Sequence, residues 1–395
     1  MKILFIAMSD SIHTARWINQ IADQGWDIHL FPSIDYGATH SDLKNVTIYH
    51  SIYGVKKNKN PNVHYSGYPI FSNIIAWSAR LIKKTIYPNY RAKQLKKIIS
   101  EVKPDIIHSL EFQGAGYLTL QVKKLDSNRF PPWIATNWGS DIYYFSRFSE
   151  HKEKIKEILE QCDYYSCECE RDIHLAKKLG LKGKTLPVIP NAGGFDLDAI
   201  KKFRQPGHTS ERRTILLKGY QGWAGRAIVG LRAIESCATE LKGYQVIIFS
   251  CNSREVKTFA SSIAKKTGIS IIILPHSSHN EMLQVFGKAR IYLGLSISDA
   301  ISTSLLESIV LGAFPIQSNT SCADEWIING KSGFIVPPED AEVIATALRK
   351  AITEDDLVNM ASLINDETAK KYLDYDRIKE NVIKFYTKLG IDKLQ

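Results

Sequence analysis

The chain has 395 residues with 44% hydrophobic content, which excludes wholesale disorder and favours two domains over a single core. Lys and Arg outnumber Asp and Glu by 51 to 41, a balance that suits phosphorylated substrates, anionic lipids or nucleic acid. No apolar run approaches the ~20 residues of a membrane span, and the opening MKILFIAMSD is too short for a signal peptide, so we expect a cytoplasmic protein.

Apolar strand-like runs alternate with amphipathic segments along the chain. The predicted strands of the first half are 3–8, 27–31, 105–110, 133–136 and 186–190, and those of the second half are 214–219, 244–250, 269–274, 291–296 and 314–318. Helical periodicity is clearest at 14–24, 226–238, 281–289 and 374–389. Repeated βα units imply parallel sheets with helices on both faces, and ligands bind such sheets at the carboxyl ends of their strands.

A polar, basic segment at 196–213 contains Pro206 and Gly207 and has no clear apolar period, so we predict an interdomain linker there. The predicted architecture is α/β, with two Rossmann-like domains of parallel sheets, 1–195 and 214–373, that face a central cleft. The final segment, 374–395, is predicted to complete the first domain. The six cysteines follow no zinc-ligand spacing and are expected to be reduced and buried; we predict no metal site.

The basic charge is uneven. Residues 68–103 carry eight Lys or Arg and one acidic residue, interleaved with aromatic and aliphatic residues at roughly helical spacing. This composition is typical of an amphipathic helix at the surface of an anionic membrane. A helix with a core face and a solvated basic face has the same pattern, so both interpretations stay open. Without an RNP, helix-turn-helix or zinc-finger signature, the charge does not predict nucleic-acid binding.

The most informative stretch is SISDAISTSLLESIVLGAFPI, at residues 296–316. An apolar strand precedes it; Ser302, Thr303 or Ser304 can cap a helix that Gly312 can end. Asp299 is thereby predicted in a strand-to-helix loop, with Glu307 about one turn into the helix. A helix N-terminus beside two carboxylates suits an anionic group with several hydroxyls, as in a nucleotide sugar. An ordinary crossover with two solvated acidic residues is the alternative.

Further loops after predicted strands carry polar residues. His13 and Arg16 follow the first strand, although a lone histidine is more often structural, and Gly139 and Asp141 follow the strand at 133–136. The strand at 214–219 leads into YQGWAGRA, where Arg226 offers a planar fork for phosphate oxygens.

With these residues in view, the chain resembles the GT-B-fold retaining glycosyltransferases of family 4 (group 1) over nearly its whole length. The resemblance rests on KILFIAMSDSIHTARWINQIADQGWDIHLF, TNWGSDI, VIPNAGGFD and the segment from TILLKGY to GFIVPPED. Its strongest element is Asp299 with Glu307, a variant of the family's acid-x7-Glu motif.

The resemblance implies transfer of a sugar, with retention and without a metal or other cofactor, from a UDP- or GDP-linked donor to a glycan or lipid-linked acceptor. Glu307 would bind ribose hydroxyls, and Asp299 would contact the transferred sugar. The implied catalytic residues are Asp299, Arg226 and Asp141; the implied donor-binding residues are Glu307, Ala300, Ile301, Ser302, Thr303, Ser304, Leu305, Lys218, Tyr220 and Asn191; the implied acceptor-side residues are His13, Arg16, Trp138 and Gly139.

Four departures from the family pattern are visible. Tyr220 stands where relatives often have Arg, Trp138 stands in place of a histidine, SDSIH replaces a Gly-Gly pair, and the first motif acid is Asp rather than Glu. A UDP-sugar 2-epimerase-type isomerase, for which His276 and His279 are available, and a non-catalytic sugar-nucleotide-binding protein are the alternatives.

Overall fold

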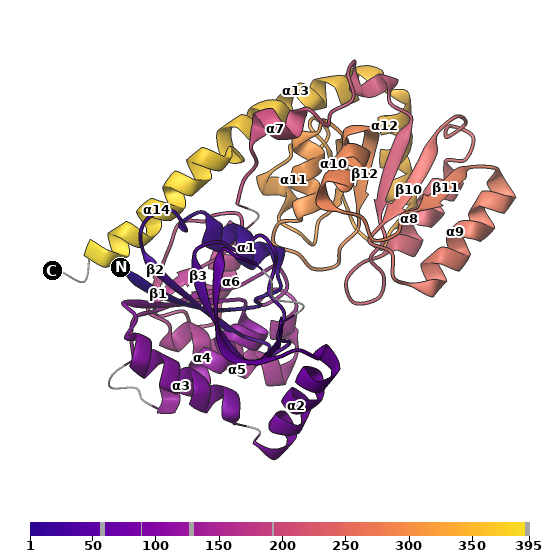
Figure 1. Cartoon of the computed structure of the whole chain (residues 1–395). Coiled ribbons are helices and arrows are strands. Elements are labelled where there is room, and N and C mark those ends of the chain that lie inside the picture. The colour runs from indigo at the N-terminus through magenta and orange to yellow at the C-terminus, as the bar shows by residue number, and fades with distance from the viewer. Residues whose placement is uncertain (56–59, 88, 126–129, 192, 392–395) are drawn as a thin grey trace. The chain divides into compact units, whose positions relative to one another are not determined.

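The computed structural model describes residues 1–55, 60–87, 89–125, 130–191 and 193–391. The chain divides into two compact units, each built around its own sheet (Figure 1). Unit 1 comprises Met1–Gly193 and Ile378–Gln395, and unit 2 comprises Gly194–Arg377. Among the described residues, no helix is long and apolar enough to cross a membrane.

Unit 1 holds an eight-stranded parallel sheet in the order β4-β3-β2-β1-β5-β6-β7-β8. The strand order reverses between β1 and β5, which makes that point the topological switch of the sheet. The strands are β1 (Lys2–Ala7), β2 (Asp27–Pro32), β3 (Val46–Gly54), β4 (Val63–Ile70), β5 (Ile106–Leu110), β6 (Trp133–Thr136), β7 (Tyr164–Ser166) and β8 (Lys184–Thr185). The helices are α1 (Ile12–Asn19), α2 (Asn73–Ile86), α3 (Tyr90–Val102), α4 (Tyr117–Leu125), α5 (Ser149–Gln161), α6 (Glu170–Lys178) and α14 (Tyr375–Ile391).

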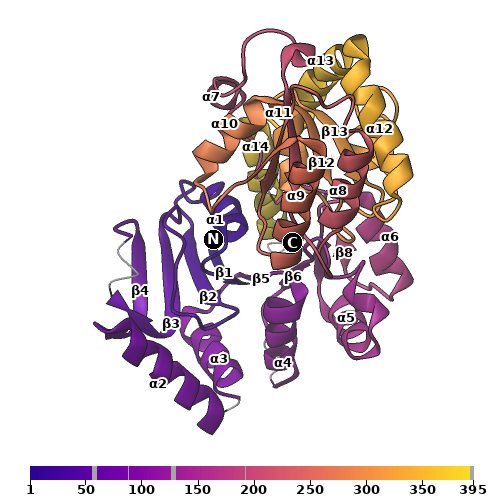
Figure 2. The ribbon, with the colours of Figure 1, turned by 90° about the vertical axis from the view of Figure 1, so that its right-hand side faces the viewer.

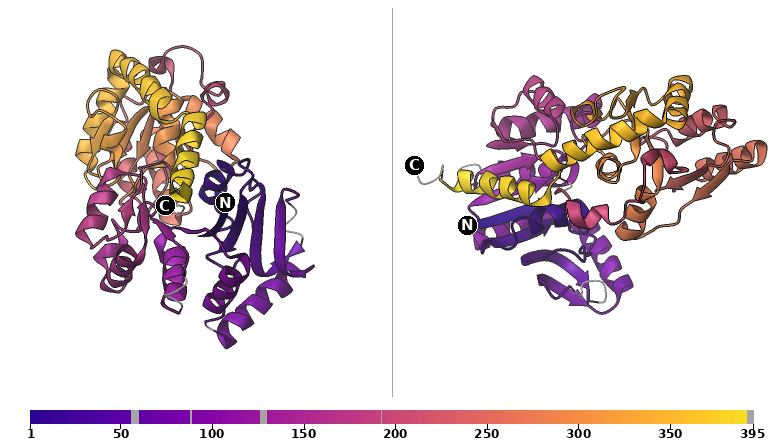
Figure 3. Two further views of the ribbon diagram at one scale, coloured as in Figure 1. Left: turned by 90° about the vertical axis from the view of Figure 1, so that its left-hand side faces the viewer. Right: turned by 90° about the horizontal axis from the view of Figure 1, so that it is seen from above.

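Alternating residues of β1 face the two hydrophobic cores of unit 1, which lie on opposite sides of the sheet. Ile3 and Phe5 face a core that α1 and α14 cover, whereas Leu4 and Ile6 face a core that α3, α4 and α5 cover. In Figures 1 and 3 the yellow C-terminal helix accordingly lies along the N-terminal strands. The period-2 alternation of a strand buried on both faces explains why β1 reads as a continuous apolar run.

A buried polar node attaches α14 to unit 1. The indole N–H of Trp17 donates to Tyr386 Oη at 2.8 Å, and Tyr386 Oη lies 2.6 Å from His108 Nδ1. Because Tyr386 accepts from Trp17, its own proton is available for His108 Nδ1. His108 Nε2, 2.6 Å from Thr136 Oγ1, then carries the ring proton. Burial lowers the pKa of His108 to about 3, so the ring is neutral.

Unit 2 holds a six-stranded parallel sheet in the order β11-β10-β9-β12-β13-β14, with its switch point between β9 and β12. The strands are β9 (Thr214–Lys218), β10 (Gln245–Phe249), β11 (Ser270–Ile273), β12 (Ala289–Gly294), β13 (Phe314–Ser318) and β14 (Phe334–Val336). The helices are α7 (Leu197–Lys201), α8 (Ala227–Ser236), α9 (Arg254–Thr267), α10 (His279–Gly287), α11 (Thr303–Val310), α12 (Ala341–Thr353) and α13 (Asp355–Tyr372).

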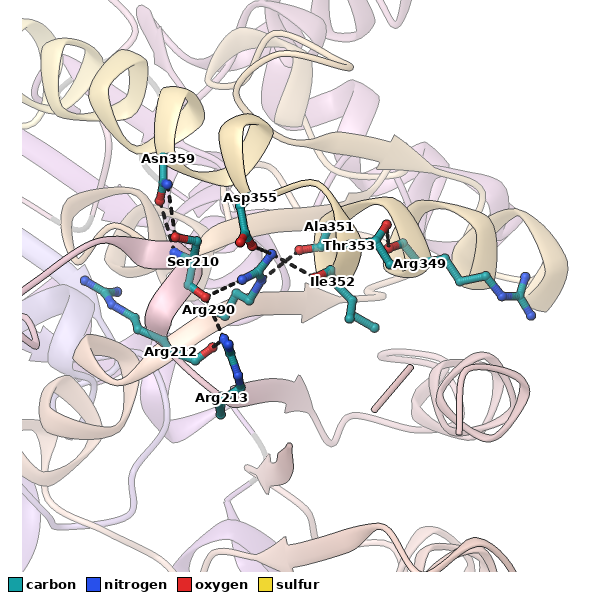
Figure 4. Close-up of polar contacts among 10 residues, drawn as sticks. All are labelled: Ser210, Arg212, Arg213, Arg290, Arg349, Ala351, Ile352, Thr353, Asp355 and Asn359. Atoms are coloured by element: carbon teal, nitrogen blue, oxygen red, sulfur yellow. Dashed lines mark hydrogen bonds and ion pairs between the residues drawn. The ribbon is translucent and has the colours of Figure 1, made fainter. Parts of the chain in front are cut away.

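The segment 196–213 belongs to unit 2 and is folded, which corrects the predicted linker. Arg212 is buried and donates to the carbonyl oxygens of Ala289 and Leu311 at 3.1 and 3.0 Å. The carbonyl oxygen of Ser210 accepts from the buried Arg290, which also pairs with Asp355 (Figure 4). Backbone carbonyls accept hydrogen bonds from both of these guanidinium groups, so a segment of linker-like composition packs as part of a domain.

Most predicted strands form, with one exception. LPVIP (186–190) is not a strand, although Leu186 N donates to Tyr165 O at 2.8 Å. The strands β3, β4, β7, β8 and β14 were not predicted; the last three are two or three residues long, and β4 is a partly exposed edge strand that lacks an apolar run. All six cysteines lie among the described residues, are buried and form no disulfide, as expected.

Candidate active site

The donor-side candidates of unit 2 gather at its switch point. Lys218 ends β9, and Asp299 lies in the loop that follows the neighbouring strand β12. Glu307 is the fifth residue of α11, which begins after that loop. Because β9 and β12 are parallel, their carboxyl ends meet at one edge of the sheet, and the residues that follow them converge there.

Lys218 is the cation at the centre of this cluster. Its ammonium is buried, 3.1 Å from Ser302 Oγ, 4.0 Å from Asp299 Oδ2 and 4.6 Å from the centroid of the Tyr220 ring. Burial by itself lowers the pKa of Lys218, but the pKa is raised overall because Tyr292, Asp299, Tyr220 and Glu307 surround it. Lys218 therefore stays charged and offers a positive group to an anionic ligand.

The N-terminus of α11 adds backbone donors beside that ammonium. Ser302 is the N-cap residue, yet its side chain makes no capping hydrogen bond and accepts from Lys218 instead. Ala300, Ile301 and Leu305 are buried, and the Leu305 amide donates to Ser302 O at 2.9 Å. Thr303 and Ser304, both half-exposed, begin the helix where first-turn N–H groups and the helix dipole favour an anion.

Glu307 is held by a residue that the sequence did not assign to this site. Its side chain is 8% exposed, and Oε1 lies 2.9 Å from Nε2 of His279, the first residue of α10. The pair crosses 28 positions of sequence, so no local pattern could have indicated it. The histidine thereby holds one oxygen of the carboxylate in place.

Arg226, predicted to grip a diphosphate, forms an ion pair in the structure. Its Nε and Nη2 lie 2.8 and 2.7 Å from Oε1 of Glu339, and Nη1 donates to Gly225 O at 3.1 Å. Glu339 follows β14 in the VPPED segment and was not predicted as a site residue. An anionic ligand would have to compete with Glu339 for this guanidinium, whereas Lys218 already lies in the cluster.

In unit 1, the acceptor-side candidates follow β1 and β6, the two strands that flank β5. His13 is in the first turn of α1, after β1, and its ring lies 5.7 Å from the Trp138 ring, edge to face. Trp138 and Gly139 follow β6, and their loop is half-exposed. Arg16 lies one turn beyond His13 and is half-exposed. The structure thus brings His13 and Trp138 together from distant parts of the sequence.

Asp141 is buried beneath this loop. Its Oδ2 accepts from the amides of Trp138 and Phe112 at 2.7 and 2.8 Å, so the carboxyl ties the loops after β6 and β5 together. Burial, with the neighbouring charge of Glu111, raises the pKa of Asp141 well above its usual range. These contacts describe a side chain that positions the loop.

Glu111 is a buried acid that the sequence did not single out. It follows β5 with φ of 77°, a conformation that a non-glycine residue rarely adopts, and its carboxylate accepts from the Gly114 amide at 2.6 Å. A five-residue π-helix, Phe112–Gly116, comes next. Strained residues and π-helical turns gather at functional sites, which adds Glu111 to the candidates of unit 1. Asn191, predicted to bind donor, also lies in unit 1 and is not part of the unit 2 cluster.

Two family models match the chain, one in each unit. The model described as "Glycosyl transferase 4-like" matches residues 2–165, and the model described as "Glycosyl transferases group 1" matches residues 203–368. A comparison with curated proteins finds no match.

Solved structures with the same fold span the whole chain. Sucrose-phosphate synthase from Thermosynechococcus elongatus has a TM-score of 0.68 at 13% identity, over 99% of this chain and 100% of that chain. HepE of Anabaena in complex with UDP-glucose has a TM-score of 0.68 at 13% identity, over 98% and 100%. A glycosyltransferase from Rickettsia africae has a TM-score of 0.66 at 16% identity, over 98% of both chains. With both units matched by family models and both sheets in the GT-B arrangement of parallel strands, the chain belongs to the group 1 (family 4) glycosyltransferases.

Proposed function

We propose that this protein transfers a sugar, with retention of anomeric configuration, from a UDP- or GDP-linked donor to a hydroxyl of a glycan or lipid-linked acceptor. The single observation that carries the proposal is the grouping of Lys218, Asp299 and Glu307 at the switch point of unit 2, beside the N-terminus of α11. Two structures of similar fold hold UDP-sugars, which supports a nucleotide-linked donor: HepE of Anabaena holds UDP-glucose, and a trehalose-6-phosphate structure from E. coli holds UDP-2-fluoro glucose.

Each residue then has a chemical role in the proposed reaction. Glu307, oriented by His279, accepts hydrogen bonds from ribose hydroxyls. The diphosphate lies against Lys218 and the first-turn N–H groups of α11, with Arg226 as a further cation once it leaves Glu339. These groups supply the positive charge that a metal ion would otherwise provide.

The reaction breaks the bond between the anomeric carbon and the diphosphate oxygen, and the bonding electron pair stays on the diphosphate. The acceptor oxygen forms the new bond on the same face of the sugar, and its proton passes to the leaving diphosphate. Asp299 faces the positive charge that develops on the sugar ring and stabilises it. We place the reaction in the synthesis of cell-surface polysaccharide or glycoconjugate, on the cytoplasmic side.

A panel of UDP- and GDP-sugars tests the proposal. Slow release of nucleoside diphosphate from one donor is expected for a transferase; epimerised sugar without release would indicate an isomerase; binding alone would indicate a non-catalytic protein. Glu307→Gln should weaken nucleoside diphosphate binding about 10- to 150-fold, since a hydrogen bond to a charged group contributes about 1.5–3 kcal/mol. The matched control is Glu255→Gln at an exposed position of α9. An α-linked product from an α-linked donor, read by NMR, would establish retention.

A further inference from the structure

Exposed apolar side chains concentrate on one helix of unit 1 and on the residues that flank it. Of the 21 large hydrophobic residues that are exposed among the described residues, nine lie between Tyr68 and Tyr87. Phe71, Ile74 and Trp77 are 79%, 77% and 60% exposed. A contiguous group of this kind on a water-soluble domain marks an interaction surface.

The helix α2 is oriented with its small and charged residues inward. Ala76 is buried, Arg80 Nη1 donates to Ile52 O at 3.0 Å, and Lys83 Nζ lies 4.9 Å from the centroid of the Tyr90 ring. These positions, i, i+4 and i+7, form the inner face, which packs on β3 and β4 (Figure 2). The outer face presents Ile74, Ile75, Trp77, Leu81, Ile82 and Ile86. This outcome rules out the predicted alternative of a core-facing apolar stripe with a solvated basic face.

The charged residues in the sequence around α2 are all basic. From Leu43 to Ser100 the sequence contains eleven Lys or Arg and no Asp or Glu, whereas the rest of the chain has 40 Lys and Arg against 41 Asp and Glu. This one stretch therefore carries the whole positive surplus of the protein. Lys93, Lys96 and Lys97 are exposed on α3, which lies near α2 at the same end of unit 1 (Figures 1 and 2).

We propose that the outer face of α2 docks unit 1 on an anionic lipid bilayer, with the α3 lysines against the headgroups. An apolar helix face with flanking cations and aromatic residues is what an interfacial helix requires. A second copy of the chain fits this surface poorly, because a two-fold interface would bring the same positive stretch against itself. Nucleic acid fits poorly too, because isoleucine and leucine make no contact with phosphate.

The docking surface borders a cavity of about 510 Å³ at the carboxyl edge of the sheet. Asp10 from the loop after β1, Tyr36 from the loop after β2, and Trp77 and Arg80 of α2 line it. Trp77 thus belongs both to the outer face and to the cavity wall. Given the proposed transfer reaction, an acceptor anchored in the bilayer would reach this cavity directly from the membrane surface, which favours a lipid-linked acceptor over a soluble glycan.

Vesicle co-sedimentation of the full chain, without any sugar nucleotide, tests the docking separately from the transfer reaction. We expect binding to vesicles of phosphatidylcholine with phosphatidylglycerol, little binding to phosphatidylcholine alone, and a steep loss as salt rises. Replacing Lys93, Lys96 and Lys97 with Gln should weaken binding about fivefold per charge, since each basic residue near such a surface contributes about that factor. The matched control replaces Lys242, Lys257 and Lys265 of unit 2, which are also exposed.

The apolar contribution has its own variant pair. Ile82→Ser with Ile86→Ser should reduce vesicle binding at least tenfold, whereas Met360→Ser with Leu363→Ser, at exposed positions of α13, should not. Because these side chains are already exposed, both double variants should have the melting temperature of the wild type. If brominated lipid quenches the tryptophan fluorescence of the wild type and this quenching is lost in Trp77→Phe, α2 lies in the bilayer. Three results would overturn the proposal. The first is equal binding to neutral and anionic vesicles, and the second is unaltered vesicle binding by either test variant. The third is a dimer, detected by sedimentation, that the double substitution Ile82→Ser with Ile86→Ser converts to monomer.

Discussion

Lys218 and Arg226 are the two cations that the sequence analysis predicted to bind the diphosphate, and the substitution Lys218→Gln tests which of them does so. In the structure Lys218 lies 4.0 Å from Asp299 and 3.1 Å from Ser302 at the N-terminus of α11, whereas Arg226 is paired with Glu339. A charged hydrogen bond contributes about 1.5–3 kcal/mol, so the substitution should weaken binding of UDP or GDP about 10- to 150-fold. Arg226→Ala should cost less, since its guanidinium must first leave a carboxylate.

The same substitution should affect stability only modestly. Two unit charges 4 Å apart attract by about 4 kcal/mol at an effective dielectric constant of ~20. Asp299 is 25% exposed and regains water when the ammonium is removed, so most of that attraction is offset. We expect a loss of about 1 kcal/mol, or roughly 2–4 °C in melting temperature for a unit of this size.

Calorimetric titration with UDP and GDP, beside a thermal melt without nucleotide, measures both effects. Lys265→Gln, on the exposed face of α9, is the matched control. If Lys218→Gln binds nucleoside diphosphate as tightly as the wild type while Glu307→Gln does not, the diphosphate does not lie on Lys218 and the assignment is wrong.

Three further predictions concern charge and pH. Glu339→Gln releases Arg226 and should tighten nucleoside diphosphate binding several-fold in calorimetry at low salt; weaker binding would mean that the carboxylate itself contacts the ligand. The pKa of Asp141 is raised in the fold, so its contribution to stability is present at low pH and is lost as pH rises; Asp141→Asn should therefore melt higher than the wild type at pH 8 and lose that advantage near pH 4. The pKa of His108 is lowered to about 3, so its contribution to stability is present above its ordinary pKa and is lost as pH falls. Between pH 6 and 4, the free energy of unfolding, measured in urea, should therefore fall more steeply in the wild type than in His108→Gln, by about 1.4 kcal/mol per pH unit. Parallel pH dependences of the two proteins would contradict a neutral His108.

Local patterns were sufficient for the elements that frame the candidate site. An apolar run ending in small polar residues indicated the β12 strand, and the helix that carries Glu307 begins and ends where Ser302 and Gly312 indicated. The contacts between those elements were not predictable in the same way. Lys218 and Ser302 are 84 positions apart, and Arg226 and Glu339 are 113 apart. Such pairs arise from the order of strands in the sheet, which no local pattern contains.

The polar segments show the same division. Composition alone indicated a linker at 196–213, but Arg212 is buried against backbone carbonyls that only the folded unit 2 assembles, so the segment packs as part of that unit. The periodicity of the sequence predicted that α2 is amphipathic, but it did not indicate whether the apolar face or the basic face would pack against the sheet.

The sequence by itself determined the βα alternation, the two-domain α/β class and the motif of Asp299 and Glu307, because strand and helix periods depend on neighbours a few residues away. Tertiary structure decided which cation joins that motif and that His279 holds its glutamate, because those groups meet only when parallel strands align their carboxyl ends. Tertiary structure also decided that the apolar face of α2 remains uncovered. Ala76 is buried and Arg80 donates to a backbone carbonyl of β3, so the larger apolar side chains of the helix point away from the sheet.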